Sequence, residues 1–221
     1  MRQLTPIALA LVLVTCGGTP APAASSATPS AAPSASIAVV ATAAPTYAPT
    51  AEGFSSKVLV EKPRTLSTSA TGFVWLASGP AIDASTVTAA VSDSESFTGS
   101  FVASTDRKAI AAAKAPYATP DLPPLAAGQY TEGLRHVTVQ SGGRSAAHMH
   151  SGIEGVLVIE GRVLIRSGAN APVYLTPGQG FYILPKIPVQ LINAGTTVAR
   201  TVVYSISPEG APFSTELGQA P

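Results

Sequence analysis

Two histidines and a glutamate in the second half of the chain are the residues best suited to chemistry. His148 and His150 are two positions apart, which in a β-strand puts both imidazoles on one face, about 6.6 Å apart along the chain. The Ser151-Gly152 pair allows a turn, and residues 153–159 read as a return strand that begins near Glu154. If this glutamate faces the histidines, two imidazoles and one carboxylate converge, which suits a divalent first-row transition metal with open coordination positions.

The spacing of these residues resembles the first sequence motif of the cupin superfamily. Its defining positions read Gly142, five residues, His148-Met149-His150, three residues, Glu154, six residues, Gly161. A second stretch is similar to the second cupin motif, with Pro177-Gly178-Gln179-Gly180, Pro185, Pro188 and Asn193-Ala194-Gly195. The two motifs cover residues 142–195, and predicted flanking strands extend the similarity to about 117–208.

The resemblance implies an all-β fold, the cupin double-stranded β-helix or jelly-roll barrel, with an additional β-rich region before it. The strand pattern agrees, because short β-prone runs follow one another between Gly- and Pro-marked turns. These runs are residues 134–140, 146–150, 153–160, 162–166, 172–175, 180–184, 189–193 and 198–207. Gly161 is the expected tight turn, where glycine adopts positive φ at little cost.

The fourth metal ligand of the family is a histidine just after Pro188, where this chain has Val189. An aliphatic side chain cannot bind a metal, so the motif positions leave His148, His150 and Glu154 as predicted ligands. Three are enough for catalytic zinc or non-haem iron, and the expected ion is Fe, Mn, Zn, Cu or Ni. A one-residue slip would bring in Gln190 instead, but it would reverse the face of the whole strand.

Another interpretation treats the two histidines as neutral, hydrogen-bonded groups in a barrel that has lost its metal. We favour metal binding, because two histidines at i and i+2 with a spaced glutamate are a metal-ligand pattern. The third histidine, His136, is expected to be structural or exposed, and Arg144 to lie on the surface.

The N-terminus resembles an export signal. Met1-Arg2 is followed by an apolar run over residues 7–14. Cys16 comes just after this run, in the sequence Leu13-Val14-Thr15-Cys16, which is similar to a bacterial lipobox. In this interpretation the signal (residues 1–16) is cut before Cys16, which carries a lipid, and the protein is anchored on the extracytoplasmic side of the cell membrane. The alternative is an ordinary signal peptide cut near the alanines at 22–24.

The rest of the chain divides by composition. Residues 17–55, rich in Ala, Pro, Ser and Thr, are expected to form a disordered tether. Residues 56–116 read as a β-rich extension, which either adds strands to the cupin sheets or is a degenerate second cupin; we favour added strands. Residues 117–210 are the predicted cupin domain, and residues 211–221 a frayed tail.

Two classes of function remain open. The net charge of +1 and the charged fraction of 11% give no basic surface for nucleic acid. We lean to a binding module that holds a small ligand with a divalent metal beside it, because the motif that survives in this chain is the one for holding, and nothing in the sequence specifies a reaction. The alternative is a metal-dependent enzyme of the dioxygenase, isomerase or decarboxylase type, with Glu154 as candidate general base. A homodimer is compatible with both.

Overall fold

Runs of β-branched and aliphatic residues fold as strands throughout the described part of the chain. The computed structural model describes residues 47–92, 97–114 and 116–218, so the predicted signal, Cys16 and most of the predicted tether lie outside it. Within these residues, no helix has the length and apolar character needed to cross a membrane.

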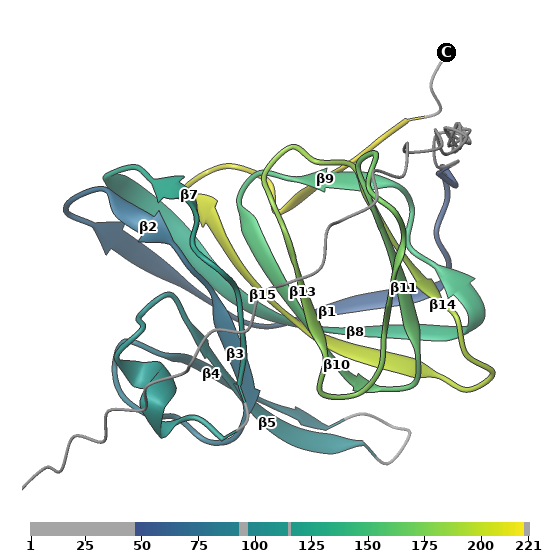
Figure 1. Ribbon diagram of the computed structural model, residues 1–221, viewed down its shortest axis with the longest axis horizontal. Helices are drawn as coiled ribbons and strands as arrows, with labels where there is room; N and C mark the ends of the chain where they lie inside the picture. The colour runs from purple at the N-terminus through teal and green to yellow at the C-terminus, as the bar shows by residue number, and fades with distance from the viewer. Residues whose placement is uncertain (1–46, 93–96, 115, 219–221) are drawn as a thin grey trace, which may run out of the picture. The chain divides into compact units, whose positions relative to one another are not determined.

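Ten strands form a large sheet that curls into a nearly closed barrel (Figure 1). Its main path runs β12-β11-β14-β8-β15-β10-β13, while β1 pairs with β8, and β9 pairs with both β14 and β16. This is the all-β cupin barrel that the sequence predicts. The strands are β1 (Glu52–Leu66), β8 (Gly128–Arg144), β9 (His148–His150), β10 (Ile153–Glu160), β11 (Val163–Ser167), β12 (Val173–Leu175), β13 (Gly180–Ile183), β14 (Val189–Asn193), β15 (Ala199–Pro208) and β16 (Ser214–Glu216).

A smaller four-stranded sheet, ordered β4-β5-β3-β6, packs on the outside of the barrel (Figure 1). Its strands are β3 (Trp75–Ser78), β4 (Val87–Ser92), β5 (Thr98–Ser104) and β6 (Tyr117–Ala118). A two-stranded ribbon, β2 (Ala70–Gly72) with β7 (Leu122–Leu125), and a 3₁₀ helix, η1 (Ala109–Ala112), complete this region.

Three hydrophobic clusters hold these layers together. One fills the barrel and includes Val137, Val156 and Ile165. The second joins the outer face of the barrel, including Leu134 and Tyr204, to the small sheet. The third, around Trp75, lies on the other face of the small sheet. Because β8 contributes to the first two, it is buried on both faces.

The folded region begins earlier and ends later than the sequence suggested. The tether was predicted to reach residue 55, but β1 starts at Glu52, and the Tyr47 hydroxyl donates a hydrogen bond to the Gly168 carbonyl at 2.8 Å. The predicted frayed tail contains β16, which pairs with β9. The start of β1 and β16 are positioned by backbone pairing with other strands and not by burial of apolar side chains, so no apolar pattern marks them in the sequence.

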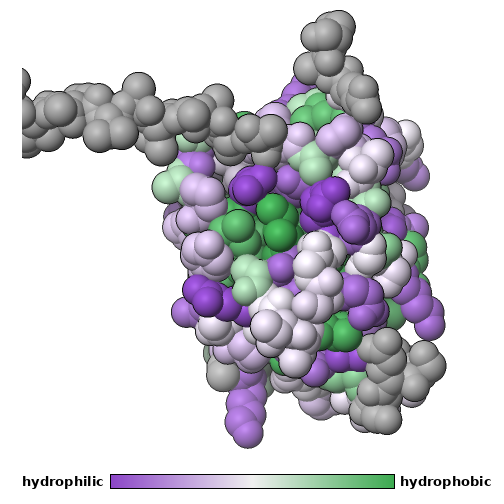
Figure 2. Space-filling view, turned by 90° about the vertical axis from the view of Figure 1, so that its right-hand side faces the viewer, coloured by the Kyte–Doolittle hydropathy of each residue, from purple (hydrophilic) through white to green (hydrophobic). Residues whose placement is uncertain are grey.

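The surface in Figure 2, on the side where β11 and β14 lie in Figure 1, is mostly polar with a small hydrophobic group near its centre. Among the residues that the structure describes, Val58 (44% exposed) and Tyr174 (55% exposed) are the exposed large hydrophobic side chains. Scattered apolar residues of this kind are normal on a protein surface. A homodimer, which the sequence leaves possible, stays a prediction.

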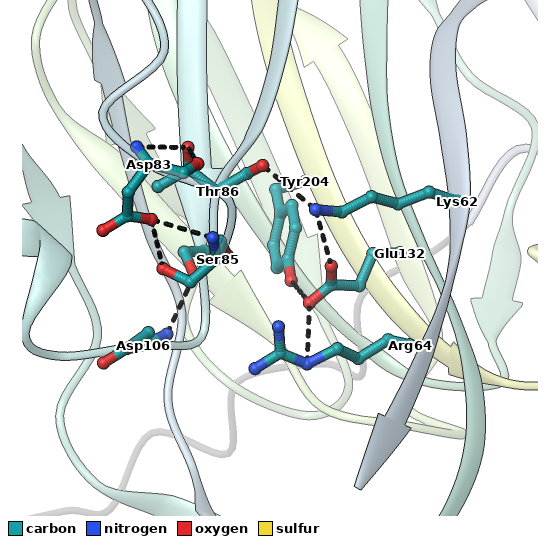
Figure 3. Close-up of polar contacts among 9 residues, drawn as sticks. Lys62, Arg64, Asp83, Ser85, Thr86, Asp106, Glu132 and Tyr204 are labelled. Carbon is teal, nitrogen blue, oxygen red and sulfur yellow. Dashed lines mark hydrogen bonds and ion pairs between the residues drawn. The ribbon is translucent and has the colours of Figure 1, made fainter.

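A buried glutamate links three strands behind the barrel (Figure 3). Glu132 on β8 is fully buried, and it accepts a hydrogen bond from the Tyr204 hydroxyl of β15 at 2.9 Å. Two cations of β1, Lys62 and Arg64, each lie 3.8 Å from its carboxylate. A buried charge is tolerated only with such partners, so this cluster ties β1 and β15 to β8.

A glycine sets the turn that carries the two motif strands. A Cβ built on Gly152 would lie 1.9 Å from the carbonyl oxygen of Ile206 and 2.6 Å from the Cα of Ser207. Both atoms belong to the backbone of β15 and cannot give way cheaply. The β9–β10 turn therefore rests directly on β15.

We expect Gly152→Ala to lower the free energy of unfolding by at least about 2 kcal/mol, because the new methyl group forces the turn away from β15. Urea unfolding followed by circular dichroism measures the change. Gly218→Ala is the control, since a Cβ there meets open space. Equal stability of the two variants would contradict this close packing.

Tyr204→Phe should lower the free energy of unfolding by about 1–3 kcal/mol, because it removes the hydrogen bond that the Tyr204 hydroxyl donates to the buried Glu132 carboxylate. The same urea titration at neutral pH gives the value. Tyr174→Phe, at a ring that is 55% exposed, should change stability by less than about 0.5 kcal/mol. If both variants behave alike, the Glu132 cluster does not contribute as described.

Candidate metal and ligand site

The barrel encloses a cavity of about 210 Å³ that brings the predicted site residues together. His148 and His150 enter it from β9, and Glu154 enters from β10. Val156 lines the same cavity, so Glu154 and Val156 share one face of β10, as expected from sequence. The Ser151-Gly152 turn joins the two strands, which do not form a hairpin: β9 pairs with β14 and β16, and β10 pairs with β13 and β15.

Val189 closes the cavity at the position of the absent fourth ligand. It is 2% exposed, lines the cavity and pairs across the strands with His148. The neighbouring Gln190 points away, and its side-chain amide donates to the carbonyls of Ala48 and Ser145. The alternative register with Gln190 inside is therefore not adopted.

Backbone carbonyls determine which nitrogen of each histidine faces the cavity. Nδ1 of His148 lies 2.8 Å from the Ala146 carbonyl oxygen, and Nδ1 of His150 lies 3.1 Å from that of Phe213. A carbonyl can only accept, so each Nδ1 carries the proton and donates. Each neutral ring then keeps its lone pair on Nε2, as metal-binding histidines do.

The Nε2 atom of His150 lies 2.7 Å from Oε2 of Glu154, and the two side chains are 2% and 6% exposed. Neither atom has a partner with hydrogen-bond geometry among the described residues. A lone pair and a carboxylate oxygen repel at this distance unless a cation lies between them. The pair therefore needs a proton or a metal ion.

The electrostatics of the two rings differ. Burial by itself lowers the pKa of His150, but the adjacent Glu154 carboxylate outweighs it and raises the pKa above the ordinary value. For His148, burial dominates and lowers the pKa, against a smaller opposing effect of its bond to the Ala146 carbonyl. The raised pKa favours a proton on His150 in the metal-free site, and the lowered pKa favours a neutral His148.

The donor set fits a divalent transition metal, although the side chains are not spread around a common point. Among the residues that the structure describes, no three His, Cys, Asp or Glu side chains form a group ready to hold a metal ion. The two rings lie edge to face with centroids 4.7 Å apart. Two ligands on one ion, each about 2.1 Å from it, are roughly 3 Å or more apart. His150 and Glu154 must therefore separate for both to bind.

Three further residues of the cavity were not identified from sequence. Arg135 lies on β8, while Phe213 and Glu216 come from the segment predicted to be a frayed tail. The Phe213 ring packs 4.8 Å from that of His150 and lies 4.0 Å beneath the Arg135 guanidinium, measured to the ring centroid. Neither Arg135 nor Phe213 carries a sequence signal, because β8 has apolar residues on both faces and Phe213 lies in a segment without a hydrophobic pattern.

The other charged candidates lie away from the cavity. His136 is 5% exposed and stacks on Phe97, with ring centroids 5.7 Å apart, so it is a buried structural histidine. Arg144 pairs with Glu52 at 2.9 Å. Neither residue lines the cavity.

Comparison with known proteins identifies the barrel. The family described as "Cupin domain" matches residues 135–205, which contain both sequence motifs and all three candidate ligands. A search of curated proteins gave no match.

Several solved structures are similar to parts of the chain. One is of DMSP lyases, with 19% identity over 39% of this chain and 44% of that chain and a TM-score of 0.36. Another is oxalate oxidase in complex with the substrate analogue glycolate, with 21% identity, 39% and 46% coverage and a TM-score of 0.36. A cupin family protein with a double-stranded β-helix fold from Methanocaldococcus jannaschii has 14% identity, 35% and 70% coverage and a TM-score of 0.33.

The chain spans less than half of the lyase and oxidase chains, so their activities say nothing direct about it. The family match, the two motifs and the barrel agree on the fold. Residues 135–205 are therefore a cupin domain.

Proposed function

We propose that this cupin barrel binds a small molecule beside a divalent transition metal held by His148, His150 and Glu154. The observation that carries the proposal is the chemistry of these three groups in one cavity. Both rings donate Nδ1–H to backbone carbonyls, which leaves each Nε2 as a donor atom toward a metal, and a buried carboxylate oxygen lies 2.7 Å from one of them.

Each residue has a definite part in this proposal. The Ala146 and Phe213 carbonyls orient the rings, and Glu154 supplies negative charge where burial would otherwise exclude a cation. When bound, a divalent transition metal supplies a Lewis-acidic centre for an oxygen atom of the ligand. Val189 and the apolar wall exclude water from one side of the site.

Removing the donor atoms should remove the metal. The full chain is stripped with EDTA, supplied separately with Mn, Fe, Zn, Cu or Ni, and assayed for bound metal by mass spectrometry. We expect about one ion per chain for at least one metal, and at least a tenfold lower affinity in His148→Ala, His150→Ala and Glu154→Gln.

His136→Gln is the matched control, because this buried histidine lies outside the cavity; it should bind metal as the native chain does. The favoured metal should also raise the melting temperature of the native chain, which is an independent measure of binding. Metal retained in all three site variants would place the ligands elsewhere, and no uptake of any metal would reject the metal part of the proposal.

We also propose export and lipid anchoring through Cys16, from the apolar run and the lipobox-like sequence that precede it. Expressed in a bacterial host, the chain should incorporate labelled palmitate and sediment with membranes. Cys16→Ser should abolish the labelling, while Thr15→Ala, which keeps the thiol, should not. Unlabelled native protein found free of membranes would instead favour an ordinary cleaved signal.

A further inference from the structure

Arg135 places a positive charge in the wall of the cavity. Its side chain is 15% exposed, and it lines the same cavity as His148, His150 and Glu154. The guanidinium carbon lies over the Phe213 ring, 4.0 Å from its centroid, and this cation–π contact helps to hold the side chain in place. Its charge also acts on the site, since it opposes the larger effect of Glu154 on the pKa of His150.

The hydrogen-bonding capacity of this guanidinium is only partly used. One terminal nitrogen of Arg135 lies 2.6 Å from Oε1 of Glu61, while the buried Nε has no hydrogen-bond partner among the described residues. The Glu61 side chain is 46% exposed, so it can turn to solvent at little cost. A ligand that enters the cavity can therefore take its place on Arg135.

The other residues of the cavity wall determine what kind of ligand could bind to Arg135. Most of the wall is aliphatic, with Val137, Val156, Ile165, Ile183, Leu191 and Val203. The other charged groups of the wall, Glu154 and Glu216, are acidic, so a ligand with two negative charges would be repelled. A volume of about 210 Å³ is small for a ligand pocket.

We propose that the cavity takes a small monocarboxylate with an apolar body, whose carboxylate displaces Glu61 from Arg135. The planar guanidinium matches a carboxylate in two-point contact. The aliphatic wall covers the body of the ligand, and its far end approaches the histidines. This inference rests on the proposed ligand-binding role of the barrel, but it does not require a bound metal.

The test compares benzoate with benzamide, its neutral counterpart, by calorimetric titration of the full chain at pH 7 in EDTA. Without metal, a proton on His150 is balanced by the adjacent Glu154 carboxylate, so Arg135 is the positive charge of the cavity wall that distinguishes the two probes. Benzoate should bind at least tenfold more tightly than benzamide, and Arg135→Gln should reduce benzoate binding to the level of benzamide. Equal binding of the two probes to the native chain would overturn the proposal.

Glu61→Gln makes the test independent of any damage to the fold. It removes the competitor for Arg135, so benzoate should bind severalfold more tightly while benzamide binding stays unchanged. If Arg135 serves only to hold β1, the same variant gives no gain, which also overturns the proposal. Metal uptake, measured separately, should survive in Arg135→Gln, so failure of the metal proposal is distinguished from failure of this one.

Discussion

The site depends on one short contact, the 2.7 Å approach of His150 to Glu154 inside the barrel. Because the Phe213 carbonyl fixes the proton of His150 on the far nitrogen, a lone pair faces a carboxylate where little water reaches. Such a pair is stable only around a cation. A proton or a divalent metal ion between the two groups would meet this requirement, and the divalent ion would do so with greater charge.

The fold enforces this contact through two tight junctions. Gly152 lets the β9–β10 turn rest against the backbone of β15, which aligns the glutamate strand with the histidine strand. On the other side of β9, pairing with β16 brings the Phe213 carbonyl to His150. The small outer sheet does not enter the cavity, but it covers the outer face of the strands that form the back of the barrel.

Much of the barrel could be predicted from sequence because its turns carry strong signals. Gly161 has the positive φ, +75°, that a tight turn requires, and β14 runs over the residues predicted for it. The sequence left open which way Glu154 faces, and in the structure it lines the cavity together with Val156. The three candidate ligands came from motif spacing, and the cavity does gather them.

What the sequence did not reveal has physical causes. On β8, Leu134 packs under the small sheet while Arg135 and Val137 face the cavity, so apolar residues occur on both faces and alternation no longer marks the interior. The β16 strand consists of exposed polar residues, which are held by backbone pairing. A short polar strand has no hydrophobic period, and its position depends on an edge formed by residues far away in the chain.

The cavity wall is formed both by strands of the barrel and by the C-terminal segment that carries Phe213 and Glu216, and this has an evolutionary consequence. The residues suited to metal lie on strands locked into the barrel, where most substitutions endanger folding. Phe213 and Glu216, by contrast, come from a segment that is held by the pairing of β16 with β9, and of these two side chains only the Phe213 ring packs against the barrel cluster. Natural variation in that segment can therefore change the ligand specificity of the cavity, while the three candidate metal ligands stay unchanged.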